Sequence, residues 1–182
     1  MKTLITSLRM LLILTLLTGV LYPALITVLG QTFWPKKAFG SLIQKGDKII
    51  GSQLLAQKFT QAKYFTSRPS MSNYDTIPSG ASNLSATSRV FADLIRKRRD
   101  AIGANAPAEL LTTSGSGLDP HLSPESIRYQ LNQVAEARGL SVEQKTKLDQ
   151  LVEKHTEYPT YGFIGAKIVN VLNLNLDLDK EF

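Results

Sequence analysis

The sequence predicts an α+β fold: one N-terminal transmembrane helix followed by a single domain with a mostly antiparallel sheet and packed helices. Three observations favour this class. Residues 10–30 are uncharged and mainly aliphatic, two later segments combine helical apolar spacing with capping residues, and a segment near the C-terminus alternates leucine with polar residues. Helical spacing indicates packed helices, and one-sided alternation indicates a half-buried strand of an antiparallel sheet.

The apolar segment of residues 10–30 comes first and follows Lys2 and Arg9. A helix rises about 1.5 Å per residue, so about 20 apolar residues cross a hydrocarbon core about 30 Å thick. The alternative is a cleaved secretory signal, but its apolar region spans about 7 to 15 residues and ends at a small-x-small site. We therefore expect an uncleaved anchor.

The charges around this segment do not orient it, because four lysines that follow it offset Lys2 and Arg9. These lysines are Lys36, Lys37, Lys45 and Lys48. Long domains are translocated largely regardless of their charge, which favours an N-terminus inside the cell. We expect residues 1–9 in the cytoplasm, residues 10–30 in the membrane and residues 31–182 in an extracytoplasmic domain.

Within the span, Thr15, Gly19 and Tyr22 recur at three- and four-residue spacing. Small residues let neighbouring helices approach closely, and Pro23 frees the carbonyl group of Gly19 for a bond to another group. The span is therefore either a simple tether or a helix that packs on another subunit.

Length and composition limit what kind of protein the residues after the apolar segment can form. About 150 residues are enough for one domain with its own core. The chain has no cysteine, which excludes a lipoprotein anchor and disulfides, and its net charge is +6. The only basic run, residues 96–99, ends a helix expected from about Ser85 to Ile102, where cations complement the helix dipole. We therefore expect no nucleic-acid partner.

The other elements follow in chain order. The polar residues 68–86 predict a long loop, while residues 48–59 fit either a strand or a helix. Ser123 and Pro124 predict the start of a helix that ends at Gly139, and Ser141 with Gln144 predicts a capping box for a helix that runs to about His155. Residues 168–178 predict a half-buried strand, with Asn173, Asn175 and Asp177 on its polar face.

A glycine-rich loop, Ser114-Gly115-Ser116-Gly117, leads into Asp119-Pro120-His121. Its amides could hold an anion or oxyanion, and Ser114 or Ser116 with His121 would suit a membrane-anchored hydrolase. The alternative is a tight turn in which Gly115 and Gly117 supply positive φ. The two histidines, His121 and His155, have no partner at metal-ligand spacing, so no metal site is expected.

Several motifs occur in one order along almost the whole chain and together resemble the C subunit of the bacterial Kdp potassium-transporting ATPase. The most specific are Tyr64-Phe65-x-x-Arg68-Pro69-Ser70, Ser79-Gly80-Ala81-Ser82-Asn83-Leu84, Ser114-Gly115-Ser116-Gly117-Leu118-Asp119-Pro120-His121 and Val169-Asn170-Val171-Leu172-x-Leu174-Asn175. The family commonly has a second glycine where this chain has Ala81. If that position needed positive φ, alanine would cost about 1 kcal/mol or more.

The resemblance implies an accessory subunit of an ATP-driven potassium import complex in the cytoplasmic membrane. Its partners would be a KdpA-like channel subunit, a KdpB-like P-type ATPase subunit, a KdpF-like small subunit and membrane lipid. The family role is to assemble the complex and to act as a catalytic chaperone that raises the ATP affinity of the B subunit. ATP with magnesium is used by the complex and potassium is the transported ion, so we expect no cofactor on this chain.

The resemblance implies no catalytic residue of the chain's own. We expect its partner or ligand contacts in the motif loops, at Arg68, Ser70, Ser79, Gly80, Ser82, Asn83, Ser114, Ser116, Gly117, Asp119 and His121. The expected membrane-helix packing residues are Thr15, Gly19, Tyr22 and Pro23.

Overall fold

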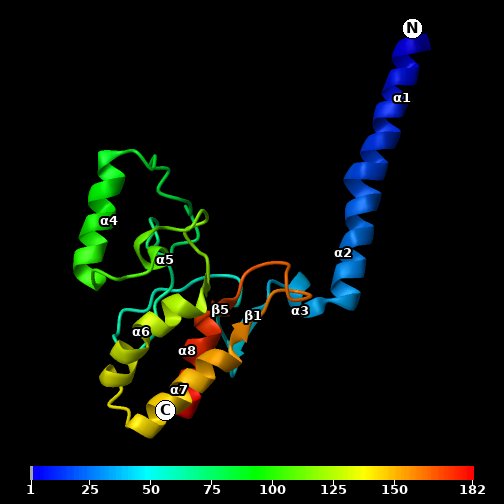
Figure 1. The fold of residues 1–182 in the computed structure, drawn as a ribbon. Helices are drawn as coiled ribbons and strands as arrows, with labels where there is room; N and C mark the ends of the chain where they lie inside the picture. Colours follow the sequence, from blue (N-terminus) through cyan, green and yellow to red (C-terminus); the bar gives the residue numbers. More distant parts are fainter. Residues whose placement is uncertain (1) are drawn as a thin grey trace. The chain divides into compact units, whose positions relative to one another are not determined.

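The computed structural model describes residues 2–182, so Met1 of the expected cytoplasmic segment lies outside the described residues. The chain forms two compact units, Met1–Ser52 and Gln53–Phe182. Helices and small antiparallel sheets make up the structure, which confirms the α+β class (Figure 1).

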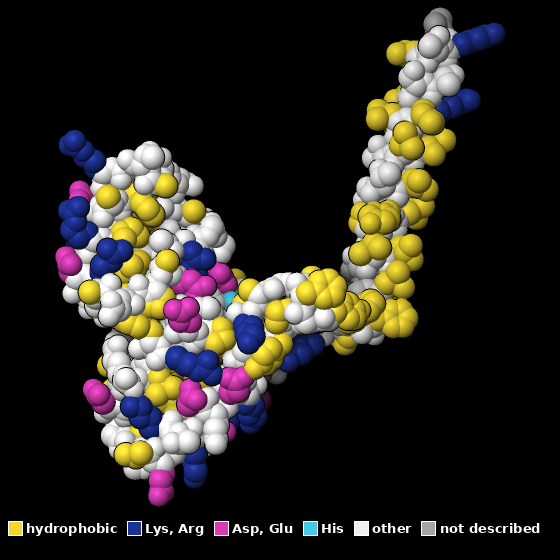
Figure 2. All heavy atoms as spheres, viewed as in Figure 1, with side chains coloured by type: hydrophobic (Ala, Val, Ile, Leu, Met, Phe, Trp, Pro, Cys, Tyr) yellow, Lys and Arg dark blue, Asp and Glu magenta, His cyan; other side chains and the backbone are white. Residues whose placement is uncertain are grey.

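The first unit begins with one long apolar helix, made of α1 (Lys2–Leu16), a π-helical turn η1 (Leu17–Leu21) and α2 (Tyr22–Phe33). It spans 32 residues with a mean hydropathy of 2.2 in its most apolar window, and none of that window is buried. Its length and composition suffice to cross a membrane. Apolar side chains cover it along most of its length (Figure 2).

A short helix α3 (Pro35–Ala38) and a hairpin complete the first unit. Strand β1 (Leu42–Lys45) pairs antiparallel with β2 (Lys48–Ser52), with a register irregularity between Ile43 and Gln44. The ambiguous segment of residues 48–59 is therefore a strand only as far as Ser52.

The second unit contains five helices and three very short strands among the described residues. The helices are α4 (Arg89–Ile102), α5 (Ala108–Leu111), α6 (Pro124–Ala137), α7 (Val142–Lys154) and α8 (Val171–Glu181). The strands are β3 (His121–Leu122), β4 (Thr156–Glu157) and β5 (Ile168–Asn170), in the antiparallel order β3-β5-β4. Residues 68–86 have no helix or strand, which confirms the expected loop.

Local sequence chemistry sets the ends of α6 and α7. The Ser123 hydroxyl accepts the N–H of Ser126, and Ser141 and Gln144 form the expected capping box. Gly139 follows α6 with φ +65°, a left-handed conformation that glycine adopts without steric cost. These predictions of helix boundaries are confirmed.

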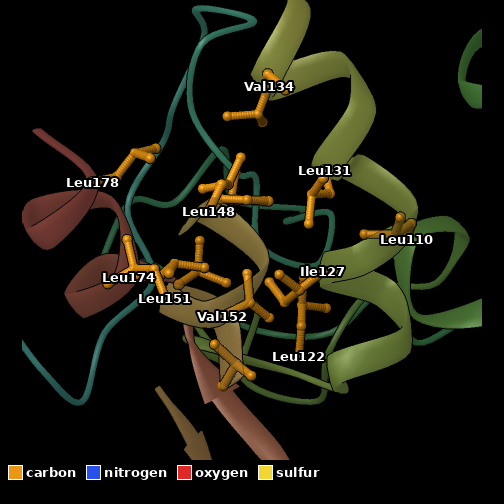
Figure 3. Packing of buried hydrophobic residues seen from close by; sticks show 14 residues of the cluster. Leu110, Leu122, Ile127, Leu131, Val134, Leu148, Leu151, Val152, Leu174 and Leu178 are labelled. Carbon is orange, nitrogen blue, oxygen red and sulfur yellow. The ribbon is translucent and has the colours of Figure 1, made fainter. Parts of the chain in front are cut away.

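The core of the second unit lies between α6, α7 and α8. Figure 3 shows Leu148 and Leu151 of α7 beside Leu174 of α8, with Ile127 and Leu131 of α6 opposite them. The helical stripes expected for α6 and α7 are all buried, which confirms them as core; they are Ile127, Leu131, Val134, Ala135, Leu148, Leu151 and Val152.

The expected strand over residues 168–178 is wrong beyond Asn170, where α8 begins. The Asn170 side chain caps this helix by accepting the N–H of Asn173 at 3.1 Å. The buried positions of α8 include Val171, Leu174, Asn175 and Leu178, which recur at helical spacing. The alternation of leucine with polar residues hid this helical stripe, because one of its buried positions, Asn175, is polar.

The helix expected from Ser85 begins instead at Arg89, where the Ser88 hydroxyl accepts the N–H of Phe91. No residue of α4 is buried. Its apolar stripe is only partly covered, so α4 contributes little to the core.

Candidate functional site

The glycine-rich loop of residues 114–117 meets the motif loop of residues 79–84 in the second unit. Gly117 has φ +71°, and a Cβ atom placed on it would lie 2.6 Å from the Gly80 carbonyl oxygen and 3.4 Å from the Ser70 hydroxyl. Only a residue without a side chain allows this approach. Three predicted residues, Ser70, Gly80 and Gly117, therefore lie together although they are distant in sequence.

Arg68 fastens the loop that carries Gly117. Its Nη2 atom donates to the Thr113 carbonyl at 3.0 Å and to the Thr112 hydroxyl at 3.2 Å. Its Nη1 atom lies 3.9 Å from Asp119 Oδ2. The planar guanidinium group reaches both ends of the glycine-rich loop because its donors point in fixed, divergent directions.

Tyr74 stabilises the segment around Arg68. Its hydroxyl donates to the Arg68 carbonyl at 2.9 Å, and its N–H donates to the Ser70 hydroxyl at 3.0 Å. Burial raises the pKa of Tyr74, which keeps the hydroxyl protonated as a donor. Tyr74 belongs to an Asn-Tyr pair in a polar loop, and no periodicity there could identify it as a bracing residue.

Asp119 and His121 lie next to each other at the start of β3. Asp119 Oδ1 accepts the His121 N–H at 3.0 Å and lies 3.5 Å from His121 Nδ1. The hydrogen bond from the His121 side chain lowers the pKa of Asp119, although burial opposes this shift. His121 Nε2 lies 3.5 Å from Asn170 Nδ2 across the β3–β5 pair.

The serines of the glycine-rich loop bond to its own backbone. The Ser114 hydroxyl accepts the Asp119 N–H at 3.4 Å, and the Ser116 hydroxyl accepts the Leu118 N–H at 3.1 Å. Within residues 2–182, no hydrogen bond joins either serine to His121, so the geometry gives the hydrolase hypothesis no support. Positive φ is confirmed for Gly117, but the expectation for Gly115 is wrong because it lies outside the left-handed region.

Of the remaining predicted residues, Ser79 and Asn83 are exposed and Ser82 is half-buried. Ser82 accepts the Leu84 N–H at 3.5 Å, Asn83 has φ +51°, and Ser79 is exposed. Ala81 is not among the residues with positive φ, so alanine there carries no such cost. The close approaches described above join Ser70, Gly80 and Gly117 and, separately, Arg68 and Asp119, and none of them involves Ser79, Ser82 or Asn83.

No sequence pattern marks Glu109, a residue of α5 that also belongs to this region. Its Oε2 atom accepts the Ser123 N–H at 2.9 Å and the hydroxyls of Ser123 and Ser126 at 2.8 Å each. Burial raises its pKa, but these bonds and the Arg68 charge outweigh burial, so the pKa of Glu109 is lowered overall. The carboxylate therefore holds the N-terminus of α6 against α5.

A separate pocket of about 370 Å³ lies beside the loops and is lined by residues including Ser67, Tyr74, Tyr129, Gln130 and Gln133. The Gln130 amide is used within the chain, since its oxygen accepts the Thr66 N–H and its nitrogen donates to the Thr66 carbonyl. None of the predicted site residues lines this pocket. The residues described by the structure contain no cluster of three histidine, cysteine or carboxylate side chains that could hold a metal.

The apolar helix presents its expected packing residues on an open surface. Thr15, Gly19, Tyr22 and Pro23 are all exposed in the chain. The helix widens at η1, which ends two residues before Pro23, and the Tyr22 N–H donates to the Leu17 carbonyl five residues back. Proline has no N–H and clashes with the preceding turn, which accounts for a π-helical turn at this place.

Comparison with known proteins agrees with the motifs over the full length. A family model described as K+-transporting ATPase, c chain, matches residues 4–180. Curated relatives named potassium-transporting ATPase KdpC subunit include one from Pectobacterium atrosepticum, 45% identical over 100% of this chain and 98% of its own length. Another from Koribacter versatilis is 44% identical over 98% of this chain and 94% of its own, and one from Myxococcus xanthus is 46% identical over 100% and 89%. With a long apolar helix at its N-terminus followed by an α+β domain, the chain belongs to the KdpC family of potassium-transporting ATPase subunits.

Proposed function

We propose that this chain assembles and stabilises a potassium-importing ATPase complex and raises the ATP affinity of its KdpB-like subunit. The observation that carries this proposal is the helix Lys2–Phe33, no described residue of which is buried by the chain itself. In a member of a transport-subunit family, such a helix is available to pack on partner helices. The proposed partners are the KdpA-like, KdpB-like and KdpF-like subunits.

The packing face of the helix centres on Gly19. A Cβ atom placed there would meet only the Thr15 methyl group, at 4.0 Å, so the surface around it is open. Small residues let helix backbones approach closely, and π-helical turns often occur at functional positions. The face with Thr15, Gly19 and Tyr22 therefore allows a neighbouring helix to pack closely against it.

We place the N-terminus in the cytoplasm and the unit Gln53–Phe182 outside the membrane, in the periplasm of a bacterium with two membranes. ATP is cytoplasmic, so this unit acts on nucleotide affinity through its partners and does not contact the nucleotide. The glycine-rich loop fits that role because the Ser114 and Ser116 hydroxyls and the Arg68 guanidinium group bond to the chain's own backbone.

The proposal is tested by purifying the tagged full chain from membranes of potassium-limited cells in mild detergent. Recovery of a P-type ATPase subunit and a channel-like subunit with the chain is expected. Gly19→Leu should reduce this recovery, while Ala24→Leu introduces the same side chain on a different face of the helix and should not. A chain that is recovered without partners would contradict the proposal.

A further inference from the structure

Between β4 and β5, residues 158–166 form an apolar turn, here called the tip, whose side chains lie outside the core cluster. Four side chains of this tip are exposed: Tyr158, Tyr161, Phe163 and Ile164. Tyr161 and Phe163 are 85% and 78% exposed, and none of the four belongs to the core cluster. Grouped apolar exposure of this kind marks a contact surface. Figure 1 shows this segment in orange.

The tip is an ordered turn. Thr160 and Ile164 exchange two backbone hydrogen bonds of 3.0 Å, and the N–H groups of Gly162 and Phe163 donate to Pro159 and Thr160. Tyr161 and Gly162 both have positive φ, +55° and +82°. Such a conformation is unfavourable for tyrosine, and no burial within the chain compensates for it. A rigid turn that displays its aromatic groups loses little entropy when it binds.

The base of the tip is fixed to the rest of the unit. The Tyr158 hydroxyl donates to Glu153 of α7, and Lys167 Nζ lies 5.0 Å from the centre of the Tyr158 ring. Residues 158–166 carry no charged side chain, and Lys167 follows them directly. This chemistry matches a lipid headgroup region, where aromatic side chains gather and lysine reaches toward the polar groups.

The chain length keeps this unit near a bilayer. The apolar helix ends at Phe33, and the second unit begins at Gln53. Residues 34–52 could span at most about 70 Å if fully extended, and their folding into α3 and the β1–β2 hairpin shortens that reach. A tether of this length gives the tip a high effective concentration at the membrane surface.

We propose that the tip, residues 158–166, inserts its aromatic side chains into the headgroup region of the same bilayer that holds the N-terminal helix. This proposal depends on the membrane anchor of the proposed function. A lipid contact fits better than a protein contact because the N–H groups of Thr160, Gly162, Phe163 and Ile164 all donate within the tip. A membrane surface needs no further hydrogen bonds from them.

The absence of cysteine from the chain allows a clean test with single spin labels. The full chain would be reconstituted in liposomes as Tyr161→Cys or Phe163→Cys, and collisions of the label with oxygen and with a water-soluble nickel complex would be compared. The matched control is Val142→Cys, because Val142 is also 85% exposed and lies at the opposite end of α7. Val20→Cys reports insertion of the anchor itself.

The expected result is a shift toward oxygen collisions at positions 161 and 163, with nickel collisions dominant at 142. Water-exposed labels at 161 and 163 together with a buried label at 20 would overturn the lipid contact and leave the anchor intact. A water-exposed label at 20 would instead contradict the anchor, and this proposal with it. If the labels at 161 and 163 are shielded only when the partner subunits are present, the tip contacts a protein. If spin–spin broadening is removed by unlabelled chain, the tip contacts a second copy of the chain. Either result would overturn the proposal.

Discussion

The Gly80 carbonyl oxygen lies 2.6 Å from the position that a Cβ atom on Gly117 would occupy, so the glycine-rich loop and the motif loop of residues 79–84 approach each other closely through their backbones. Gly117→Ala should reduce the free energy of unfolding by about 2 to 4 kcal/mol, because it adds both a left-handed alanine and a backbone clash. Denaturant unfolding of the full chain in detergent measures this. Gly115→Ala is the matched control: it has open space around it and should change stability by less than about 0.5 kcal/mol. Equal effects of the two substitutions would refute the close approach.

Replacement of Arg68 even by lysine should reduce the stability of the fold. Arg68→Lys keeps the charge but loses the geometry that reaches Thr112, Thr113 and Asp119, so we expect a loss of about 1.5 to 3 kcal/mol. Thermal or denaturant unfolding would show it. Arg96→Lys alters an exposed pair with Asp93 on α4 and should cost less than about 0.5 kcal/mol. If Arg68→Lys proves as mild as the control, the arginine does not hold the loop.

Asn175 is 1% exposed and bonds to both backbone groups of Phe65: its Oδ1 accepts the N–H at 3.0 Å and its Nδ2 donates to the carbonyl at 2.8 Å. Asn175→Ala should cost about 2 to 5 kcal/mol, because two buried polar groups lose their partner. Asn173→Ala changes a partly exposed side chain of the same helix and should have little effect. The unfolding midpoints of Asn175→Ala and Asn173→Ala, measured side by side, test this difference, and equal midpoints would contradict it.

Glu109 should make the stability depend on pH in the acid range. Its folded pKa is lowered, so its contribution is fully present above the unfolded value of about 4.3 and is lost as the pH falls through the folded value. Glu109→Gln should cost about 1 to 2 kcal/mol at neutral pH, and this difference should shrink below about pH 4.3. Glu143→Gln, in the first turn of α7, provides the control. A difference that stays constant from pH 7 to pH 3 would argue against a charged Glu109 in this role.

Capping residues and helical spacing predicted α6 and α7 correctly, because both signals lie within the sequence of each helix. Ser123, Ser141 and Gly139 marked the ends of α6 and α7, and helical spacing identified their core residues. The C-terminal leucines misled because alternation fits a strand as well, and only the capping bond from Asn170 and the buried Asn175 distinguish the helix α8.

The candidate site was predictable as a set of motifs but not as a geometry. The sequence marked Ser70, Gly80 and Gly117, yet their contact depends on long-range packing that no spacing encodes. Glu109 and Tyr74 gave no signal, because each acts through bonds to backbone or hydroxyl groups elsewhere in the chain. The positive φ of Gly117 was predicted from the turn, whereas the same argument failed for Gly115.

The most direct test of the proposed role is the ATP dependence of potassium-stimulated ATPase activity, measured on the purified complex with and without this chain. If the chain raises the ATP affinity of the KdpB-like subunit, its removal should raise the KM for ATP, and adding back the full chain should restore it. A complex that assembles without the chain and keeps the same KM and kcat would contradict the proposal.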